Sequence, residues 1–128
     1  MADKKTVVET LYDRCAAGDW ATVEALLTED FTLIEADGLP YGGTYKGRGA
    51  LREVYEKVFG YWSELSINLH DITIGDTHAI GLLTLSGTAK RTGKDFSMLL
   101  GEVFRFRDDK VEAIIPLYFD TKELAEIA

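Results

Sequence analysis

The chain has 128 residues, of which 46% are hydrophobic and 28% charged, and its formal net charge at pH 7 is −8. This length and composition are typical of one globular domain that can bury a core and a pocket. The 14 Lys and Arg residues form no cluster, and binding to a phosphate backbone needs a basic patch. We therefore expect no nucleic-acid partner.

The chain shows no targeting or membrane signal and no metal-binding motif. No apolar run reaches the length of a membrane span, and the charged N-terminus leads directly into a helical pattern, so we expect a cytoplasmic protein with no membrane partner. Cys15 is the only cysteine, and it is far in sequence from the two histidines, His70 and His78. This predicts no internal disulfide and no metal site.

Apolar residues that repeat with helical spacing predict three helices. They cover residues 4–17, 20–27 and about 50–62. Gly18 is placed to end the first helix, and Asp19 is placed as the N-cap of the second. A capping box formed by Asp120 and Glu123 predicts one further short helix at the end of the chain.

The remaining segments predict antiparallel strands joined by tight turns. They cover residues 31–36, 66–74, 79–90 and the hairpin 98–120. The stretch DGLPYGGTYKGRG, residues 37–49, holds five glycines and a proline, so we expect a loop there, with Tyr41 and Tyr45 as a mobile lid over a pocket. Helices followed by such a meander predict an α+β fold in which a curved sheet wraps around the helices.

Two carboxylates, Glu35 and Glu102, interrupt apolar rows on the expected strands. Side chains alternate between the faces of a strand, so Glu35 shares a face with Leu33, and Glu102 shares one with Phe104. A buried charge without compensation is costly, which makes both carboxylates candidates for function. The same alternation predicts an oily cavity lined by Leu33, Leu83, Leu85, Phe104, Ile115 and Leu117. Further candidates for the lining are Trp20, Tyr41, Phe59 and Trp62, although such aromatic residues more often belong to a core than to a ligand site.

Several segments resemble the nuclear-transport-factor-2-like cone and, within it, the SnoaL-like polyketide cyclases and the ketosteroid isomerases. They are AAGDW, EDFTLIEADG, ALREVYEKV, GEVFRF and YFDTKEL, which occur in the order and spacing of the family. The resemblance spans nearly the whole chain as one domain, residues 1–128. It implies a cone-shaped α+β barrel in which three N-terminal helices pack on a curved antiparallel sheet, as in cystatin-like folds.

The resemblance to the ketosteroid isomerases implies roles for particular residues. Glu35 matches the aspartate that moves the substrate proton in those enzymes, and Glu102 matches their oxyanion-hole aspartic acid. Tyr55 matches a tyrosine of their hydrogen-bond network. Their oxyanion-donating tyrosine matches Leu11, with Tyr12 one residue beyond, so this chain departs from the pattern at a donor that contributes strongly to catalysis.

The limonene epoxide hydrolases share the cone and the YFD ending of this chain. Their catalytic arginine and two aspartates match Leu83, Leu85 and Leu117 here. We therefore expect the epoxide-opening chemistry to be absent and the pocket to be apolar.

These observations predict a cofactor-independent isomerase, cyclase or lyase that moves a proton next to a carbonyl of a lipophilic, polycyclic or polyketide-like substrate. Glu35 is the expected base, with a pKa raised by apolar surroundings. Protonated Glu102, with Tyr55 or Tyr12, is expected to stabilise the enolate oxygen. The alternative is a non-catalytic hydrophobic-ligand-binding or association module. A Glu35 that turns outward, or a Glu102 bonded to Tyr55 for structure alone, would favour that alternative.

The other polar features have simpler interpretations. His70 and Asp71 interrupt a strand and are expected to be a solvated pair at a sheet edge, while Asp120 is expected to be only a helix cap. Polar residues on the convex side of the sheet predict a homodimer with a wet, isologous interface. They are Thr84, Ser86, Thr88, Arg105 and Arg107.

Overall fold

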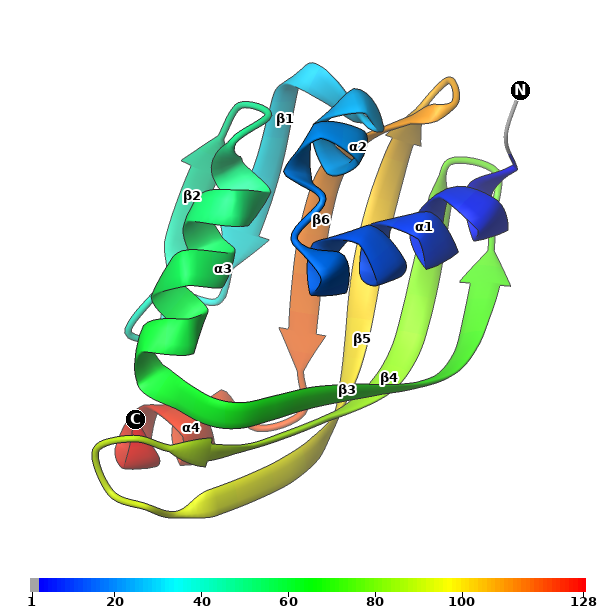
Figure 1. The fold of residues 1–128 in the computed structure, drawn as a ribbon. Coiled ribbons are helices and arrows are strands. Elements are labelled where there is room, and N and C mark those ends of the chain that lie inside the picture. The colour runs from blue at the N-terminus through cyan, green and yellow to red at the C-terminus, as the bar shows by residue number, and fades with distance from the viewer. Residues whose placement is uncertain (1–2) are drawn as a thin grey trace.

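The computed structural model describes residues 3–128, which form a curved sheet with helices packed against one face (Figure 1). The helices are α1 (Lys4–Ala17), α2 (Trp20–Ala25), α3 (Ala50–Tyr61) and α4 (Thr121–Ile127). The strands are β1 (Leu27–Glu35), β2 (Gly43–Lys46), β3 (Trp62–Ile74), β4 (His78–Ala89), β5 (Asp95–Arg107) and β6 (Lys110–Tyr118). The order in the sheet is β2-β1-β6-β5-β4-β3, and only β1 and β6 are parallel. The predicted α+β fold is confirmed, with an open sheet whose edges are β2 and β3.

The helix ends follow local signals in the sequence. Gly18 ends α1 in the left-handed conformation, with φ of 71°, a region that glycine adopts without steric cost. The Asp120 side chain accepts a 3.1 Å hydrogen bond from the backbone N–H of Glu123 and so caps α4. Helix α2 ends at Ala25, and β1 begins at Leu27, earlier than the alternation of apolar residues predicts.

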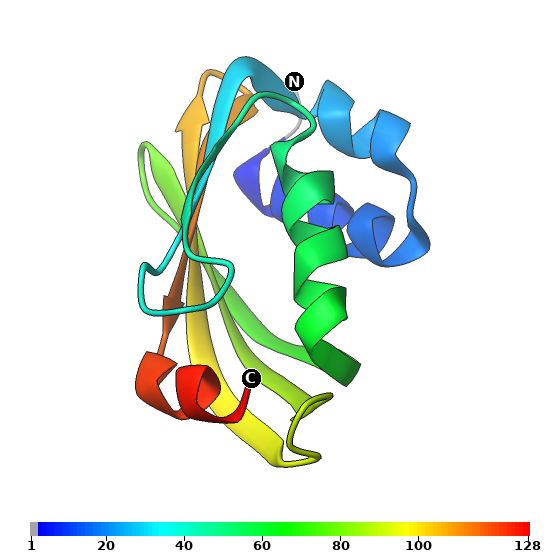
Figure 2. The same cartoon turned by 90° about the vertical axis from the view of Figure 1, so that its left-hand side faces the viewer.

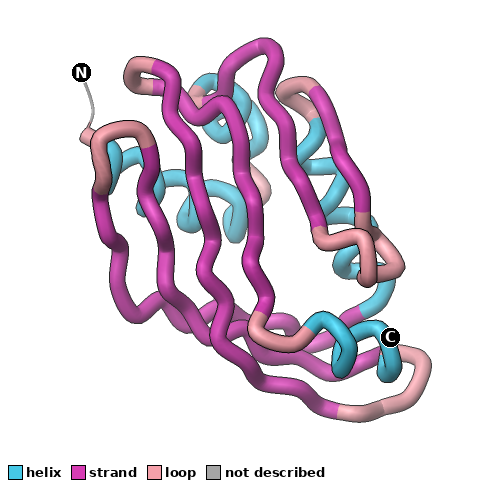
Figure 3. Tube along the Cα trace, turned by 180° about the vertical axis from the view of Figure 1, so that it is seen from behind, coloured by secondary structure: helices cyan, strands magenta, loops and turns pink. Residues whose placement is uncertain are grey.

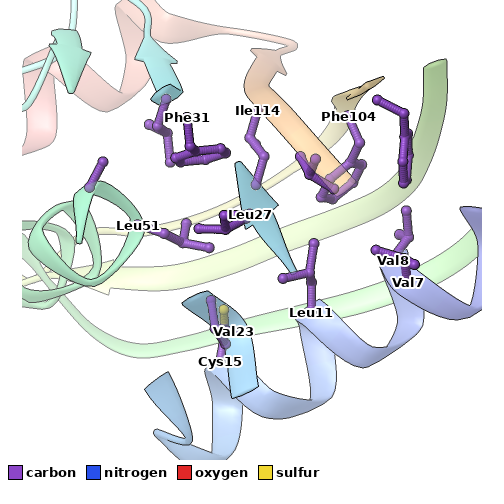
Figure 4. Close-up of a cluster of buried hydrophobic side chains, with 14 of the residues drawn as sticks. Val7, Val8, Leu11, Cys15, Val23, Leu27, Phe31, Leu51, Phe104 and Ile114 are labelled. Carbon is purple, nitrogen blue, oxygen red and sulfur yellow. The ribbon is translucent and has the colours of Figure 1, made fainter. Parts of the chain in front are cut away.

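The core lies between the sheet and the helices α1 and α3, which cover its concave face, while α4 lies at one end of the sheet (Figure 2). Figure 4 shows Val8 and Leu11 of α1 pointing toward Phe104 and Ile114 of the sheet. All four are almost inaccessible to solvent. Burying a side chain of this size contributes about 1.5–3 kcal/mol, so this layer fixes α1 across the strands.

The glycine-rich segment is partly a strand, which corrects the prediction of a loop throughout residues 37–49. Residues 43–46 form β2 at the edge of the sheet and pair with the end of β1. Gly43 and Gly47 have φ of 126° and 95°, so glycines supply the unusual backbone at both ends of this short strand. Tyr41 is only 2% exposed, and its carbonyl accepts a 2.8 Å hydrogen bond from Tyr45 Oη. In this structure Tyr41 is therefore a buried residue that packs in the core.

A bulge in β6 reverses the expected phase of its C-terminal half. Phe106 of β5 pairs with Val111, whereas Arg105 pairs with Ala113, so Glu112 is an extra residue on β6. One extra residue moves every later side chain to the opposite face.

After the bulge, the side chains of β6 that face the helices are therefore the even-numbered ones. Pro116 pairs with Glu102, and Tyr118 pairs with Leu100. Leu117 lies on the other face and is 56% exposed. The prediction that Ile115 and Leu117 line the pocket is wrong for this reason.

The convex face of the sheet carries no helix among the described residues (Figure 3). It is less polar than predicted, because apolar side chains lie beside the expected Thr84, Ser86 and Thr88. The exposed apolar residues of β4, β5, β6 and the residue after β6 are Ile80, Leu82, Leu99, Leu117 and Phe119. We call this set the outer apolar patch.

His70 and Asp71 lie on the edge strand β3, as predicted, and do not form a dyad. The ring Nε2 of His70 lies 2.7 Å from Thr84 Oγ1 on the exposed surface. The Asp71 carboxylate accepts a hydrogen bond from the backbone of Ile72. Both are surface groups outside the cavity described below.

Candidate active site

A cavity of about 650 Å³ lies between the concave face of the sheet and the helices. A volume of this size suits a small organic molecule. Its apolar lining includes Leu33, Phe59, Trp62, Leu65, Ile67, Leu69, Leu83, Leu85, Leu100 and Pro116. Its other polar or titratable lining groups are Tyr12, Cys15, Glu35, Tyr41, Tyr55, Glu102 and Tyr118. We call it the central cavity.

Glu35 points from the end of β1 into the central cavity and is 4% exposed. Phe31 and Leu33 on the same strand are also buried, whereas Ile34, the residue just before Glu35, is 38% exposed. The alternation is therefore as predicted. The outward orientation that would favour a binding module is not found. The sequence of β1 therefore delivers a carboxylate to an apolar surface.

The pKa of Glu35 is raised from 4.5 to about 7. Burial is the main cause, because the carboxylate loses water around its charge. A 2.8 Å hydrogen bond from Tyr118 Oη to Glu35 Oε1 opposes the rise, and the charge of Glu102 adds to it. A carboxyl group with a pKa near neutrality can both take up and release a proton at working pH.

Tyr118 is a site residue that the sequence analysis missed. It reaches the cavity only because the bulge at Glu112 turns it inward. Burial, and then the charge of Glu35, raise the pKa of Tyr118 far above its usual range, so it stays a hydroxyl and donates. A proline inside a strand can signal an irregular ladder, and Pro116 is the one sequence feature that hinted at this change of phase.

Tyr41 and Trp62 extend the polar cluster around Glu35. Trp62 Nε1 donates a 3.1 Å hydrogen bond to Tyr41 Oη, and Tyr41 interacts in turn with Tyr118. Burial raises the pKa of Tyr41 to about 12. Side chains from the start of β3, the 37–49 segment and β6 thus form a polar cluster, in which Tyr118 contacts Glu35 directly.

Glu102 projects from β5 into the same cavity, across from Gly81 on β4 and Pro116 on β6. Burial raises its pKa, and a hydrogen-bonding influence of Tyr12 opposes the rise. Burial thus favours the protonated form of Glu102, in which the carboxyl group can donate a hydrogen bond. Glu35 and Glu102 thus border one cavity, and their mutual repulsion favours a state with at most one charge.

The Tyr12 hydroxyl is buried beside Glu102 and has no hydrogen-bond partner within residues 3–128. It lies near enough to affect the pKa of Glu102, although the two groups form no hydrogen bond of standard geometry. Burial raises the pKa of Tyr12 far above its usual range, so the group keeps its proton. A buried donor without a partner is costly unless something fills that role.

Tyr55 and Cys15 complete this end of the central cavity. The Tyr55 ring packs against Trp20, with ring centroids 5.3 Å apart, and no hydrogen bond between Tyr55 and Glu102 is present in the described structure. The alternative in which Glu102 bonds to Tyr55 for structure alone is therefore not supported. Burial raises the pKa of the Cys15 thiol to about 12, so it is an unreactive thiol.

The predicted lining residues fall into three groups. Leu33, Leu83, Leu85, Tyr41, Phe59 and Trp62 line the central cavity. Phe104 lines only a side chamber of about 60 Å³ beyond Tyr12 and Glu102, together with Leu11. Trp20 lines neither space and supports Tyr55 from outside, whereas Ile115 and Leu117 face away.

Residues 3–128 contain no group of three or more His, Cys, Asp and Glu side chains that could hold a metal ion. No helix in the same range is long and apolar enough to cross a membrane.

The curved sheet, the helices on its concave face and the mainly apolar cavity between them define a nuclear-transport-factor-2-like domain. The family described as SnoaL-like domain matches residues 8–114. This chain therefore belongs to the SnoaL-like domain family. No curated protein matches it.

Solved structures share the fold over nearly the whole chain. A nuclear-transport-factor-2-like protein from Burkholderia thailandensis is 25% identical, with a TM-score of 0.88 over 99% of this chain and 98% of that one. TerC, co-crystallized with polyporic acid, is 16% identical, with a TM-score of 0.82 over 95% of each chain. A putative SnoaL-like polyketide cyclase from Jannaschia is 14% identical, with a TM-score of 0.80 over 95% of this chain and 89% of that one.

Proposed function

We propose that this protein is a cofactor-independent isomerase, cyclase or lyase that moves a proton next to a carbonyl group of a lipophilic, polycyclic or polyketide-like substrate. The observation that carries the proposal is Glu35, a buried carboxyl group with a pKa of about 7 at the wall of an apolar cavity. Groups tuned in this way are concentrated at functional sites.

In the proposed reaction Glu35 is the base. Its carboxylate takes a proton from the carbon next to the substrate carbonyl. The electron pair of the broken C–H bond forms a C=C bond, and the π pair of the C=O bond moves onto the oxygen to give the enolate. Tyr118 donates to Oε1 of Glu35 and orients the carboxylate while Oε2 remains free to receive the proton. The same carboxyl group then returns the proton to carbon, which closes the cycle without a cofactor.

The developing negative charge on the substrate oxygen needs hydrogen-bond donors. Protonated Glu102 and the unpartnered hydroxyl of Tyr12 are the two donors at the other part of the cavity wall. Leu11, which stands where ketosteroid isomerases keep their donor, lines the side chamber and supplies none. We propose that Tyr12, one residue further along α1, takes that role.

The comparisons support a ligand of this class. TerC was co-crystallized with polyporic acid, and another neighbour is described as a polyketide cyclase. Both share the fold at low identity, so the substrate of this chain is inferred from its own cavity. That cavity is mainly apolar, with its acids and hydroxyls placed at separate points on the wall.

Proton exchange tests the proposal without a known substrate. The bicyclic ketone 2-tetralone, incubated in D₂O with the protein, is followed by NMR for loss of its protons next to the carbonyl. We expect accelerated exchange with the native protein and loss of the acceleration with Glu35→Gln, which preserves shape and removes the base. Glu9→Gln, a change of the same kind on the exposed face of α1, is the control and should leave the rate unchanged.

The alternative function is binding of a hydrophobic ligand without catalysis. The cavity alone supports it, since 650 Å³ of apolar space suffices for a ligand. If 2-tetralone binds but its exchange is the same with native protein and Glu35→Gln, the binding function replaces the enzymatic one.

We further propose that the protein is a homodimer formed through the convex face of the sheet. The outer apolar patch lies on the strands β4 to β6 beside the polar Thr84, Ser86 and Thr88. An interface with an apolar centre and a polar rim is typical of stable association. A two-fold axis would place the same patch on both copies.

A further inference from the structure

Gly81 lies in the middle of β4, where a glycine weakens a strand and therefore requires a reason. Its backbone is not in the left-handed region that favours glycine, because Gly81 is not among the described residues with a positive φ. An alanine would therefore suit the backbone. The reason for glycine at this position lies in what a side chain would meet.

A Cβ atom at position 81 would lie 2.5 Å from Tyr12 Oη. It would also lie 3.3 Å from Cε2 and Cζ of the same ring. The Tyr12 ring cannot easily give way, because it packs edge-on against Phe104 with ring centroids 5.7 Å apart. The hydroxyl itself would have to move.

The place from which the hydroxyl would move is next to Glu102. Gly81 and Glu102 are paired residues on β4 and β5. Because Gly81 has no side chain, it leaves a space beside the carboxyl group of Glu102. Tyr12 Oη occupies that space and is buried without a hydrogen-bond partner in the described chain. The sheet thus leaves a space at Gly81, and helix α1 places the Tyr12 hydroxyl in it.

We infer that Gly81 is a positioning residue. Its lack of a side chain lets the Tyr12 hydroxyl lie beside Glu102, so that both groups can donate to one acceptor oxygen of a ligand. This inference rests on the proposed function in that it names the part of the ligand, a carbonyl or phenol oxygen, that the two donors recognise. It does not depend on whether Glu35 moves a proton.

The test compares two ligands that differ by one oxygen, 2-naphthol and naphthalene. The quantity is the preference, defined as the Kd of naphthalene divided by the Kd of 2-naphthol. One neutral hydrogen bond changes such a ratio by about threefold to tenfold. We expect Tyr12→Phe to lower the preference by this factor, and Gly81→Ala to lower it as much although it removes no polar group.

The double variant Tyr12→Phe with Gly81→Ala separates positioning from a general loss of packing. Removing the hydroxyl leaves room for the new methyl group, apart from the two 3.3 Å ring contacts, which a small shift relieves. The Tm of the double variant should therefore exceed that of Gly81→Ala, while the preference stays low. Gly101→Ala on β5 is the matched control, because a Cβ there meets only Ile80 Cγ2 at 3.8 Å. It should keep both the Tm and the preference.

The inference is overturned if Gly81→Ala keeps the native preference, if Tyr12→Phe does not lower it, or if the double variant is no more stable than Gly81→Ala. Should Gly81→Ala not fold, recovery of a folded protein by adding Tyr12→Phe supports the inference and failure to recover it contradicts it. A failure of the proposed function has a different signature. It shows in the exchange rate with Glu35→Gln and leaves the naphthol preference unaffected.

Discussion

Tyr118 Oη donates a 2.8 Å hydrogen bond to Oε1 of Glu35, although the two residues are 83 positions apart in the chain. The bond joins the ends of β1 and β6, which are parallel neighbours in the sheet. Because it stabilises the charged form of Glu35, it counteracts the effect of burial on the pKa of that group. This contact lowers the pH at which Glu35 becomes a base.

Replacing Tyr118 by Phe should therefore raise the pKa of Glu35 above about 7. The carboxylate form then appears only at higher pH, so the acidic limb of the rate profile moves upward, and the exchange rate at pH 7 falls by about tenfold. The measurement is the pH dependence of 2-tetralone exchange. A profile that stays in place, or moves to lower pH, would show that the bond does not tune Glu35.

Glu102 should tolerate an amide better than a truncation. Burial raises the pKa of Glu102 and so favours its protonated form; in the proposed role this form is a neutral hydrogen-bond donor, and glutamine also donates. We expect Glu102→Gln to keep exchange within about tenfold of native and Glu102→Ala to lose roughly a hundredfold, as removal of an oxyanion donor does. Equal losses in the two variants would contradict a donor role.

The stability of the fold should depend on the protonation of Glu35. Its pKa is about 7 when folded and 4.5 as the ordinary value, so between these pH values the folded state binds more protons than the unfolded state. Stability from this group is fully present below pH 4.5 and is lost as pH rises through about 7. The difference between the folded and ordinary pKa values corresponds to about 3 kcal/mol in the free energy of unfolding.

Urea unfolding of native protein and Glu35→Gln at pH 4.5 and pH 8 measures this effect. The free energy of unfolding of the native protein should fall relative to the variant by about 3 kcal/mol over this range, since the other carboxyl groups are common to both. Glu9→Gln is the surface control and should track the native protein. A difference between native and Glu35→Gln that does not change with pH would show that Glu35 is not buried as a titrating group.

The outer apolar patch yields a prediction about association. Leu117→Glu puts a charge on this patch, where Leu117 is 56% exposed, and should convert a dimer into a monomer at micromolar concentration. Ala125→Glu adds the same charge on the exposed side of α4 and should leave the dimer intact. Sedimentation velocity reports both. A native protein that sediments only as a monomer would contradict the proposal.

The sequence predicted those features that depend on local rules. Gly18, Asp19 and Asp120 mark helix ends through short-range hydrogen bonds and backbone preferences, and the structure confirms all three. The inward phase of Glu35 and Glu102 follows from alternation that is regular from Phe31 to Glu35 on β1 and from Glu102 to Phe106 on β5. The catalytic roles assigned to them stay predictions.

The sequence did not predict features that depend on pairing between distant segments. The bulge at Glu112 is fixed by the register of β6 against β5, and no residue in KVEAIIPLY requires it. Because of this bulge, Tyr118 lines the cavity at the place where Leu117 was expected. Strand β2 was missed because its glycines predict a loop, whereas pairing with β1 makes it a strand.

The most direct test of the central claim is a ¹³C NMR titration of the glutamate side-chain carboxyl groups, with the Glu35 resonance assigned by its absence in Glu35→Gln. We expect this resonance to titrate with a midpoint of about 7. A midpoint near the ordinary value of 4.5 would mean that Glu35 is a permanently charged group at neutral pH and would contradict its role as a tuned base.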